Sequence, residues 1–316
     1  MNNRIDRYPS RGGSRAQLVP RLDPVVYAQS STPLPLGLAP AQVAHYEQHG
    51  YMVLPEVFSA DEVALLRSEL DRLRRDPIMQ KREECITEPQ SGDIRSIFSV
   101  HEISPVIAAL TADERLSNIA RYLLADKVYI HQSRVNYKPG YRGKEFYWHS
   151  DFETWHVEDG MPAMRALSMS ISLTENTPHN GPLMLMPGSH KHYAVCTGDT
   201  PANHFKASLK KQEYGVPEDE QLKQLAQDGG IVSALGKAGS VVIFECNTMH
   251  GSNSNITPDP RSNVFLVYNA VSNRVEEPFC TQPPRPEYIC SRERIQTLVP
   301  GRFSVDDFAH RQQQSA

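Results

Sequence analysis

A series of apolar, strand-like segments between residues 128 and 275 constrains the fold of this 316-residue chain more than any other feature. Val, Ile, Leu and Tyr recur in the runs 128–137, 166–173, 240–244 and 263–268, and turns rich in Gly, Pro and Asn separate these runs. No internal repeat or low-complexity tract is present. This pattern predicts a mainly β fold with flanking helices, namely a double-stranded β-helix (a cupin-like jelly roll).

The rest of the chain has a different character on each side of this region. Residues 1–39 are rich in Pro, Ser, Arg and Gly without periodicity, which predicts an irregular N-terminal arm packed on the domain. Residues 40–76 predict a helix, a short strand and a second helix that starts at a capping box, Ser59 to Glu62. We therefore expect a single jelly-roll domain over residues 40–316, with a polar, helix-prone insert at about 195–235.

Charge and cysteine content exclude several classes of function. Lys+Arg 33 against Asp+Glu 37 gives a net charge of −4, with no basic excess to bind nucleic acid and no polybasic run to hold a membrane. The apolar runs are strand-sized, and the N-terminus lacks the apolar core of a signal peptide. The five cysteines are odd in number and scattered, as expected for thiols in a reducing cytosol. We expect a cytoplasmic protein that binds a small molecule; its oligomeric state, including a homodimer, stays open.

Pairs of a histidine and an acidic residue at positions i and i+2 are candidate starts of a metal site. Three occur: His45/Glu47, His149/Asp151 and His156/Glu158. The first pair lies in the predicted first helix, where i and i+2 point apart, and the third runs into a turn sequence. The second pair leaves an aromatic, strand-like run, and on a strand i and i+2 share a face. We therefore expect the second pair to bind one ion.

The third ligand has two candidate positions. His190 and His192 lie in a Pro/Gly loop, which favours a surface or substrate-side role. His250 directly follows a buried strand and a turn, where a jelly roll returns a residue to the mouth of the barrel. Together, His149, Asp151 and His250 are the ligand set of a mononuclear non-haem Fe(II) site, which keeps three coordination positions open for a co-substrate and O₂.

Arg261 follows His250 by eleven residues and begins the next predicted strand. Its guanidinium is permanently charged and forked, so it could hold the far carboxylate of a keto acid through two hydrogen bonds. The alternative for a single arginine is an ordinary surface salt bridge.

These features resemble the Fe(II)/2-oxoglutarate dioxygenases of the phytanoyl-CoA hydroxylase type. The resemblance rests on His149, Asp151, His250, Arg261 and the segments 50–55, 181–190 and 248–252. Within that family, the segments 146–168, 6–11 and 132–138 are similar to the ectoine-hydroxylating members, and the likeness covers nearly the whole chain. Asp151 keeps the carboxylate that related halogenases replace with a small residue.

The resemblance implies that ectoine is converted to 5-hydroxyectoine, with 2-oxoglutarate and O₂ consumed and succinate and CO₂ released. The iron centre itself would carry the chemistry, without a separate protein acid or base. The residues expected at 2-oxoglutarate are Lys138, Arg261, Ser252, Asn136, Phe146, Ser170 and Arg134. Those expected at the substrate are Gln132, Trp155 and Arg285.

Alternatives remain open for several of these residues. Alternation puts Gln132, Arg134, Asn136 and Lys138 on one strand face, which is either a cavity lining or a solvated surface. Trp155 falls on the ligand face if the strand continues past Asp151, and is otherwise a core residue. Two further functions stay open as well: a same-family hydroxylase of another small molecule (an amino or imino acid, or an acyl-CoA), and a non-catalytic metal-dependent binding protein.

Overall fold

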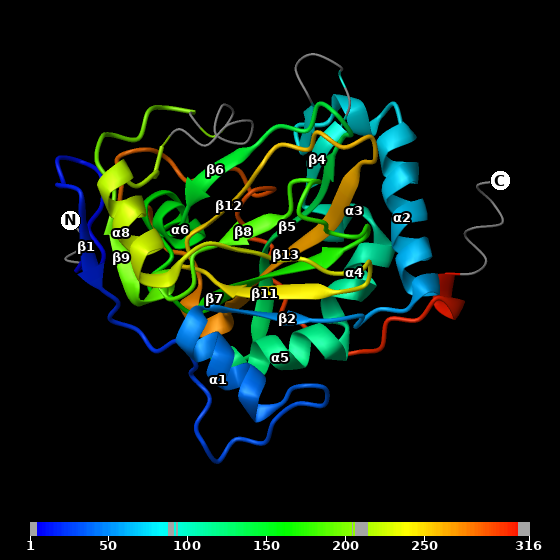
Figure 1. Cartoon of the computed structure of the whole chain (residues 1–316), viewed down its shortest axis with the longest axis horizontal. Helices are drawn as coiled ribbons and strands as arrows, with labels where there is room; N and C mark the ends of the chain where they lie inside the picture. The colour runs from blue at the N-terminus through cyan, green and yellow to red at the C-terminus, as the bar shows by residue number, and fades with distance from the viewer. Residues whose placement is uncertain (1–4, 88–91, 93, 204, 206–213, 309–316) are drawn as a thin grey trace.

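Two antiparallel sheets, one of seven strands and one of four, form the body of the molecule (Figure 1). The computed structural model describes residues 5–87, 92, 94–203, 205 and 214–308. The architecture is a jelly roll, which confirms the fold expected from the strand pattern.

The larger sheet has the strand order β2-β11-β7-β13-β5-β4-β3. Its strands are β2 (Tyr51–Leu54), β3 (Cys85–Thr87), β4 (Ile94–Phe98), β5 (Val128–Lys138), β7 (Ala166–Ser172), β11 (Val241–Glu245) and β13 (Arg261–Ala270). The smaller sheet has the order β10-β8-β12-β6. Its strands are β6 (Phe146–His149), β8 (Leu183–Leu185), β10 (Val232–Ser233) and β12 (His250–Ser252).

Alternation along the larger sheet separates an apolar outer face from a more polar inner one. In β7, Leu167, Met169 and Ile171 belong to the main hydrophobic core. The serines at 168, 170 and 172 alternate with them and point to the other side, because successive strand residues face opposite ways. The inner face of this sheet can therefore carry polar groups for a binding site while the outer face supplies the core.

Five helices between residues 40 and 124 contribute to the fold: α1 (Pro40–His49), α2 (Ala60–Arg75), α3 (Val100–Ile103), α4 (Pro105–Ala112) and α5 (Glu114–Leu124). The predicted capping box is present, since Ser59 Oγ accepts from the Glu62 amide at 3.3 Å and Glu62 Oε2 accepts from the Ser59 amide at 2.8 Å. Leu66 and Leu70 of α2 are buried in the main core. Short 3₁₀ turns occupy Met79–Lys81, Ser189–Lys191, Val271–Asn273 and Asp306–Phe308.

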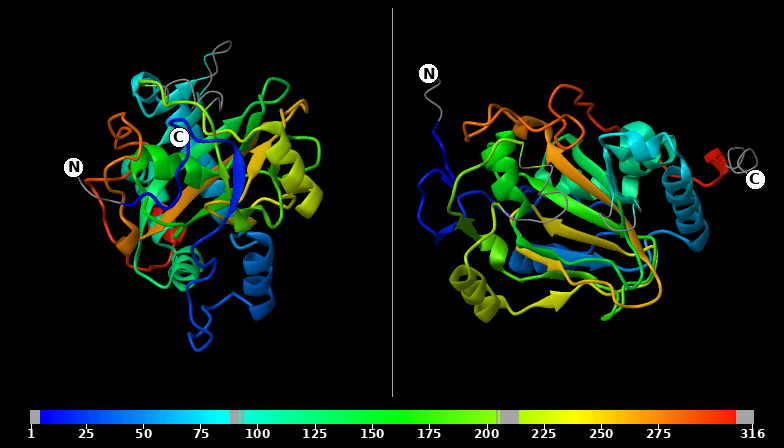
Figure 2. Two further views of the ribbon diagram at one scale, coloured as in Figure 1. Left: turned by 90° about the vertical axis from the view of Figure 1, so that its left-hand side faces the viewer. Right: turned by 90° about the horizontal axis from the view of Figure 1, so that it is seen from above.

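The N-terminal arm packs at the end of the molecule that holds β9, α6 (Asp151–Asp159) and α8, opposite α2 and the C-terminal turn (Figures 1 and 2). Its strand β1 (Gln17–Pro20) pairs antiparallel with β9 (His192–Val195). Helix α8 (Asp219–Gly229) lies within the stretch expected as an insert. Residues 1–4 of the arm and 204 and 206–213 of the insert lie outside the described residues.

The structure corrects the expected strand through residues 146–156. Strand β6 ends at His149, and helix α6 (Asp151–Asp159) begins two residues later. Ser150 between them is extended, with φ −106° and ψ 129°, so His149 and Asp151 still flank one extended residue. The pair His156/Glu158 lies inside α6 rather than in a turn, and both residues are buried.

The five cysteines form no disulfide. None of the helices in the described part of the chain combines the length and the apolar character that crossing a membrane requires.

Candidate active site

Two histidines and one carboxylate converge where the smaller sheet meets helix α6. Ligand atoms of His149, Asp151 and His250 all lie within 4.8 Å of one another, and all three residues are buried. The Nε2 atoms of His149 and His250 are 3.7 and 3.8 Å from the Asp151 carboxylate oxygens. This is the donor set of a non-haem iron centre, as the sequence predicted, with the side chains already gathered around one point.

Strand pairing and backbone carbonyls orient the two imidazoles. His149 and His250 are direct partners in the register of β6 and β12. The Nδ1 atom of His149 contacts the Tyr147 carbonyl at 2.8 Å, and that of His250 contacts the Thr248 carbonyl at 2.9 Å. Because a carbonyl only accepts, each Nδ1 carries the proton and each Nε2 presents its lone pair to the centre.

The protonation state also suits a metal. Burial, followed by the neighbouring His250, lowers the pKa of His149 to about 3, so its imidazole is neutral near pH 7. Asp151 accepts a hydrogen bond from the Ser168 hydroxyl at 3.3 Å, which fixes one carboxylate oxygen. His149 therefore fits Fe(II) as a ligand without prior loss of a proton.

A cavity of about 110 Å³ adjoins this centre. Both metal-site histidines line it, together with Arg95, Ser96, Phe98, Arg134, Asn136, Tyr137, Lys138, Lys144, Phe146, Ser170, Leu183, Gly251, Ser252, Arg261, Asn263 and Phe265. The described lining thus holds five cationic side chains and no carboxylate. A small ligand with more than one negative charge fits this electrostatic environment.

Arg261 is the best evidence for an anionic ligand. It is 9% exposed, and its Nε has no hydrogen-bond partner among the described residues. Burial lowers the pKa of Arg261 to about 10, which leaves the guanidinium charged at neutral pH. A buried charge without a partner is costly, so the structure holds a cation in place for an anion that the described residues do not supply.

Lys138 lies opposite Arg261 in the register of β5 and β13. Its Nζ donates to Ser252 Oγ at 2.9 Å and to the Asn253 carbonyl at 2.5 Å. The Asn263 amide donates to Ser170 Oγ at 2.7 Å on the same sheet. The cavity therefore combines two cations with neutral hydrogen-bonding groups at one end.

The structure brings all seven residues expected at 2-oxoglutarate into this one cavity lining: Lys138, Arg261, Ser252, Asn136, Phe146, Ser170 and Arg134. Arg134 is half-buried; desolvation of its guanidinium lowers its pKa, and the guanidinium lies 4.3 Å from the centre of the Phe265 ring. Sequence reasoning missed Arg95, Lys144 and Asn263. Asn263 could have been found, because it follows Arg261 by two residues on one strand and shares its face.

The three residues expected at the substrate lie elsewhere. Gln132 donates from Nε2 to the Ile289 carbonyl at 2.8 Å and is 6% exposed. Trp155 lies in α6 four residues after Asp151, so the two share a helix face rather than a strand face. It is 2% exposed and packs in an apolar cluster, with its ring 5.1 Å from that of His131.

Arg285 is the third of these residues, and it is bound to helix α6. Its Nε and Nη2 donate to the two Asp159 oxygens at 2.8 and 2.5 Å, and Glu158 lies 3.7 Å away. Burial alone would raise the pKa of Asp159, but Arg285 outweighs burial and lowers it to about 2. Arg285 is thus an ion-pair partner rather than an ordinary exposed loop cation.

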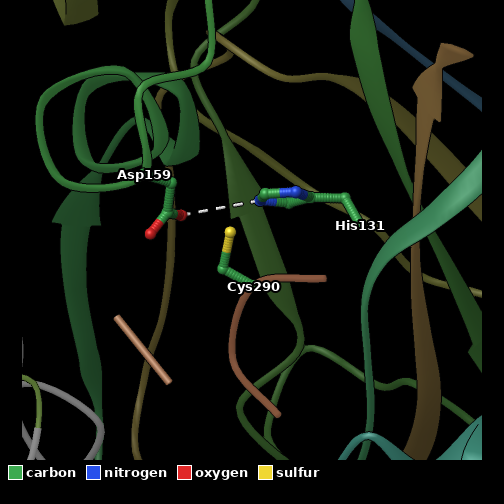
Figure 3. A group of neighbouring side chains, drawn as sticks. All are labelled: His131, Asp159 and Cys290. Carbon is green, nitrogen blue, oxygen red and sulfur yellow. Dashed lines mark ion pairs between the residues drawn. The ribbon is translucent and has the colours of Figure 1, made fainter. Parts of the chain in front are cut away.

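A second group of potential metal ligands surrounds this ion pair. His131, Asp159 and Cys290 lie close together in a buried position (Figure 3). Arg285 already occupies both Asp159 oxygens. Burial, followed by Asp159, raises the pKa of the Cys290 thiol well above its usual range. We interpret the group as part of an ion-pair network and not as a metal site.

The loop histidine His190 is not at the surface, contrary to the expectation from its Pro/Gly context. It is fully buried, and its Nε2 contacts the Glu47 carbonyl at 3.1 Å. Burial lowers the pKa of His190 to about 4. Its backbone carbonyl accepts a hydrogen bond from the side chain of Asn247 at 3.1 Å. His190 therefore supports the fold and is not a third iron ligand.

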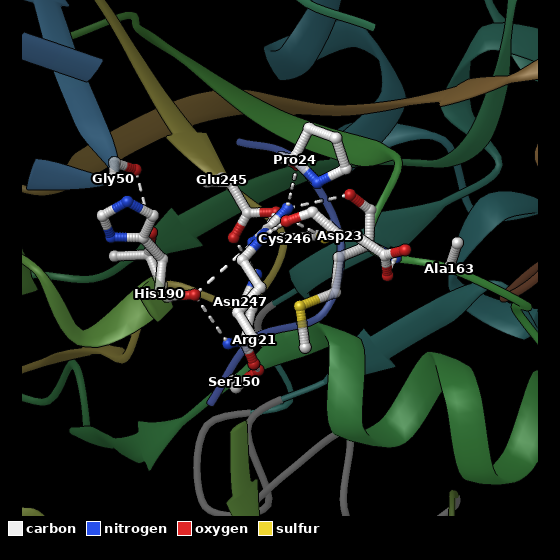
Figure 4. Close-up of polar contacts among 12 residues, drawn as sticks. Arg21, Asp23, Pro24, Gly50, Ser150, Ala163, His190, Glu245, Cys246 and Asn247 are labelled. Carbon is white, nitrogen blue, oxygen red and sulfur yellow. Dashed lines mark hydrogen bonds and ion pairs between the residues drawn. The ribbon is translucent and has the colours of Figure 1, made fainter. Parts of the chain in front are cut away.

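Asn247 links this buried region to the metal site (Figure 4). Its side-chain oxygen accepts from Ser150 Oγ at 2.9 Å, and Ser150 separates the two ligands of the His-x-Asp pair. The backbone amide of Asn247 donates to the Glu245 side chain, and Glu245 pairs with Arg21 of the N-terminal arm at 2.9 Å. Residues outside the ligand set thus hold the backbone between two of the ligands.

Comparison with known proteins places these features in a family. The model of the phytanoyl-CoA dioxygenase family matches residues 46–263. The chain is 58% identical to an ectoine dioxygenase of Sphingopyxis alaskensis, over 91% of this chain and 93% of that protein. It is 56% identical to an ectoine dioxygenase of Stutzerimonas stutzeri, over 93% and 96% of the two chains.

Solved structures agree with the sequence relatives. The crystal structure of EctD from S. alaskensis with 2-oxoglutarate and 5-hydroxyectoine superposes with a TM-score of 0.85 at 53% identity, covering 94% of this chain and 99% of that one. The form of that protein with bound Fe gives a TM-score of 0.84 over the same shares. The chain therefore belongs to the phytanoyl-CoA dioxygenase family and, within it, to the ectoine dioxygenases.

Proposed function

We propose that this protein hydroxylates ectoine to 5-hydroxyectoine, using Fe(II), 2-oxoglutarate and O₂ and releasing succinate and CO₂. The observation that carries this proposal is a buried arginine, Arg261, whose Nε has no hydrogen-bond partner in the described part of the chain. It lies beside a two-histidine, one-carboxylate centre, in a chain that is similar along its length to ectoine dioxygenases. The atoms balance: one oxygen of O₂ enters ectoine, and the other enters succinate as 2-oxoglutarate loses CO₂.

His149, Asp151 and His250 are proposed to hold the iron. When bound, Fe(II) supplies the redox chemistry that couples O₂ to the oxidation of 2-oxoglutarate and substrate. Three protein ligands would leave further coordination positions of the metal to small molecules. The orienting carbonyls of residues 147 and 248 keep both imidazoles in place while those ligands exchange.

We propose that Arg261 and Lys138 bind the far carboxylate of 2-oxoglutarate, with Ser252 as a further hydrogen-bond donor. Asn136, Phe146, Ser170 and Arg134 then line the rest of the co-substrate pocket. The low-dielectric surroundings strengthen each of these contacts and keep bulk water from the reacting groups.

Gln132, Trp155 and Arg285 are proposed to bind ectoine. Ectoine is a cyclic amidine with a carboxylate, so it needs an aromatic face for its delocalised cation and a cationic or amide group for its carboxylate. Trp155 supplies the aromatic face, Arg285 the cation and Gln132 the amide. No protein acid or base takes part, because the metal and the co-substrate carry the chemistry.

We also propose that residues 40–316 form a single domain against which the arm 1–39 packs, as the β1–β9 pairing supports. A cytoplasmic location fits the five free thiols. A homodimer stays a prediction, which sedimentation of the purified protein tests.

The function is tested with purified protein, Fe(II), 2-oxoglutarate and ectoine in air. We expect one succinate per product molecule and a product heavier than ectoine by one oxygen atom, measured by mass spectrometry. Parallel reactions with proline or an acyl-CoA in place of ectoine test a different substrate. Turnover with either of these and none with ectoine would reassign the protein within its family, and binding without turnover of any substrate would make it a sensor.

A further inference from the structure

We propose that Arg11, in the N-terminal arm, is a positioning residue for the substrate-binding half of the active site. It acts through a buried chain of ion pairs that runs along helix α6 and ends on Arg285. The proposal rests on the proposed function, because it takes Arg285 as a contact to ectoine.

Arg11 is bound to two glutamates of α6. Its Nε and Nη2 donate to the two Glu153 oxygens at 2.9 and 2.6 Å, and its Nη1 donates to Glu158 Oε1 at 2.6 Å. Nη1 also donates to Thr200 Oγ1 at 3.0 Å. The side chains of the three charged residues are only 1–3% exposed, so solvent does not screen these pairs.

The backbone at Arg11 supports a specific role. Its φ is +60°, a left-handed conformation that residues other than glycine seldom adopt. Its amide donates to the Cys196 carbonyl at 2.9 Å. Such a conformation persists where surrounding contacts determine it, and here these contacts direct the guanidinium into the protein.

The backbone at Gly215 packs directly against the ion pair of Arg11 and Glu153. A Cβ at this glycine would lie 2.2 Å from Glu153 Oε2 and 2.4 Å from Arg11 Nη2, so the backbone is in direct contact with the charged groups. With φ +68°, this position also favours glycine by conformation. The close approach excludes water from the pair.

Glu158 connects Arg11 to Arg285. One of its oxygens binds Arg11, and the other lies 3.7 Å from Arg285 Nε. The next residue, Asp159, holds Arg285 through two hydrogen bonds. Arg285 therefore lies between two adjacent carboxylates at the end of α6. How strongly it is attracted to Glu158 rather than to Asp159 depends on how well another cation neutralises Glu158.

Arg11 provides that neutralisation. Without the Arg11 guanidinium, Arg285 is the cation that remains near the Glu158 carboxylate, and in a buried site their attraction is strong. Arg285 would then shift toward Glu158 and away from its position on Asp159. Trp155 lies one turn before these carboxylates on the same helix, so the aromatic and cationic substrate contacts would be displaced together.

His131 lies at the far end of this series of ion pairs, beside Asp159 (Figure 3). Its Nε2 is 3.6 Å from Asp159 Oδ2, and its ring packs against Trp155. The pairing of β5 with β13 shifts by one residue here, since Gln132 pairs with Val267 and Ile130 with Tyr268. The bulge at His131 interrupts the alternation of β5 and re-aims this side chain, which lies against Trp155 and Asp159 of helix α6.

The test measures two binding constants separately in protein loaded with Fe(II) without O₂. The charge-transfer absorbance of the iron complex follows 2-oxoglutarate, and calorimetry follows ectoine. Arg11→Gln should weaken ectoine binding at least about tenfold, or about 1.4 kcal/mol, and leave 2-oxoglutarate binding within about twofold. Arg7→Gln is the matched control, because Arg7 lies in the same arm and pairs with Asp23 at the surface; it should change neither constant.

The double variant Arg11→Gln/Glu158→Gln separates positioning from general structural support. If Arg11 acts by neutralising Glu158, removing the Glu158 charge should restore ectoine binding to within about threefold of the wild type. A folded double variant that still binds ectoine weakly overturns the proposal, as does an Arg11→Gln protein with unchanged ectoine binding or with equal losses for both ligands. Should the single variant not fold, the double variant decides alone. Wild-type protein that binds 2-oxoglutarate but not ectoine would instead refute the proposed function, and this inference with it.

Discussion

Lys138 and Arg261 lie directly opposite each other on the neighbouring strands β5 and β13. Like charges in this relation destabilise a sheet, and Arg261 is buried without a partner at Nε among the described residues. The fold therefore places two cations on neighbouring strands where 2-oxoglutarate is proposed to bind. A dicarboxylate bound there would offset their mutual repulsion.

Replacing Arg261 with methionine should weaken 2-oxoglutarate binding by about 2–5 kcal/mol and ectoine binding far less, because a buried charge contact is lost. Titration of the anoxic Fe(II) protein measures this. Without ligands, the same variant should show a higher free energy of unfolding in urea, since an unpaired buried charge is removed. Lys144→Met serves as a control at an exposed cation of the cavity and should have a smaller effect. A larger effect on ectoine than on 2-oxoglutarate would assign Arg261 to the substrate.

His250→Ala should abolish iron retention and turnover while the protein stays folded, because one of three ligands is lost. Iron per protein after gel filtration measures the first effect, and circular dichroism measures the fold. His192→Ala, at a half-buried histidine outside the metal site, should retain iron. Full iron content in the His250 variant would remove this residue from the ligand set.

Trp155→Phe should raise the KM for ectoine several-fold and leave 2-oxoglutarate binding unchanged, because phenylalanine keeps an apolar ring but offers a weaker face to a cation. Steady-state kinetics at saturating 2-oxoglutarate measures the change. Trp155→Ala removes a large buried side chain and should also cost about 3–5 kcal/mol of stability. If Trp155→Phe loses stability with a normal KM, Trp155 is a core residue only.

The stability of the protein should fall as the pH drops below 6.5, in part because of His190. Burial lowers its folded-state pKa to about 4, from 6.5 in the unfolded chain, although Glu245 acts in the opposite direction. The unfolded chain therefore takes up a proton first, and the folded state loses about 2 kcal/mol between pH 7 and pH 5 from this group. His190→Gln should remove that part of the loss, as measured by urea denaturation at both pH values. An unchanged difference between the two pH values would show that His190 is already charged in the folded protein.

The sequence predicted the strands β2, β5, β7, β11 and β13 and the helices α1 and α2, because apolar residues recur in them with a strand or helix period. The strands β3 and β4 and the helices α3, α4 and α5 were not predicted. Helix α6 was missed for a physical reason. Almost every residue of α6 is buried, polar ones included, so the helix has no apolar stripe that sequence periodicity can detect. Glu153 and Glu158 are buried only because Arg11 reaches them from another part of the chain. No local pattern contains that information.

Motif, alternation and family resemblance together predicted that His149, Asp151 and His250 come together, and that the seven residues proposed for 2-oxoglutarate share one cavity. The surroundings of Arg285 could not be predicted, since its partner Asp159 is distant in sequence and comes from an element that was expected to be a turn. The bulge at His131 was hidden as well, because a single extra residue breaks the alternation on which a strand assignment depends.

The ion pairs of the arm set an order for biosynthesis. Arg11 is bonded to a residue 147 positions later, and Arg21 to Glu245. A ribosome makes the arm first and its partners much later, so the arm cannot dock until most of the chain has emerged. The first segment to be synthesised is thus among the last to reach its native contacts, and Glu153 and Glu158 of helix α6 lack their cation until it does.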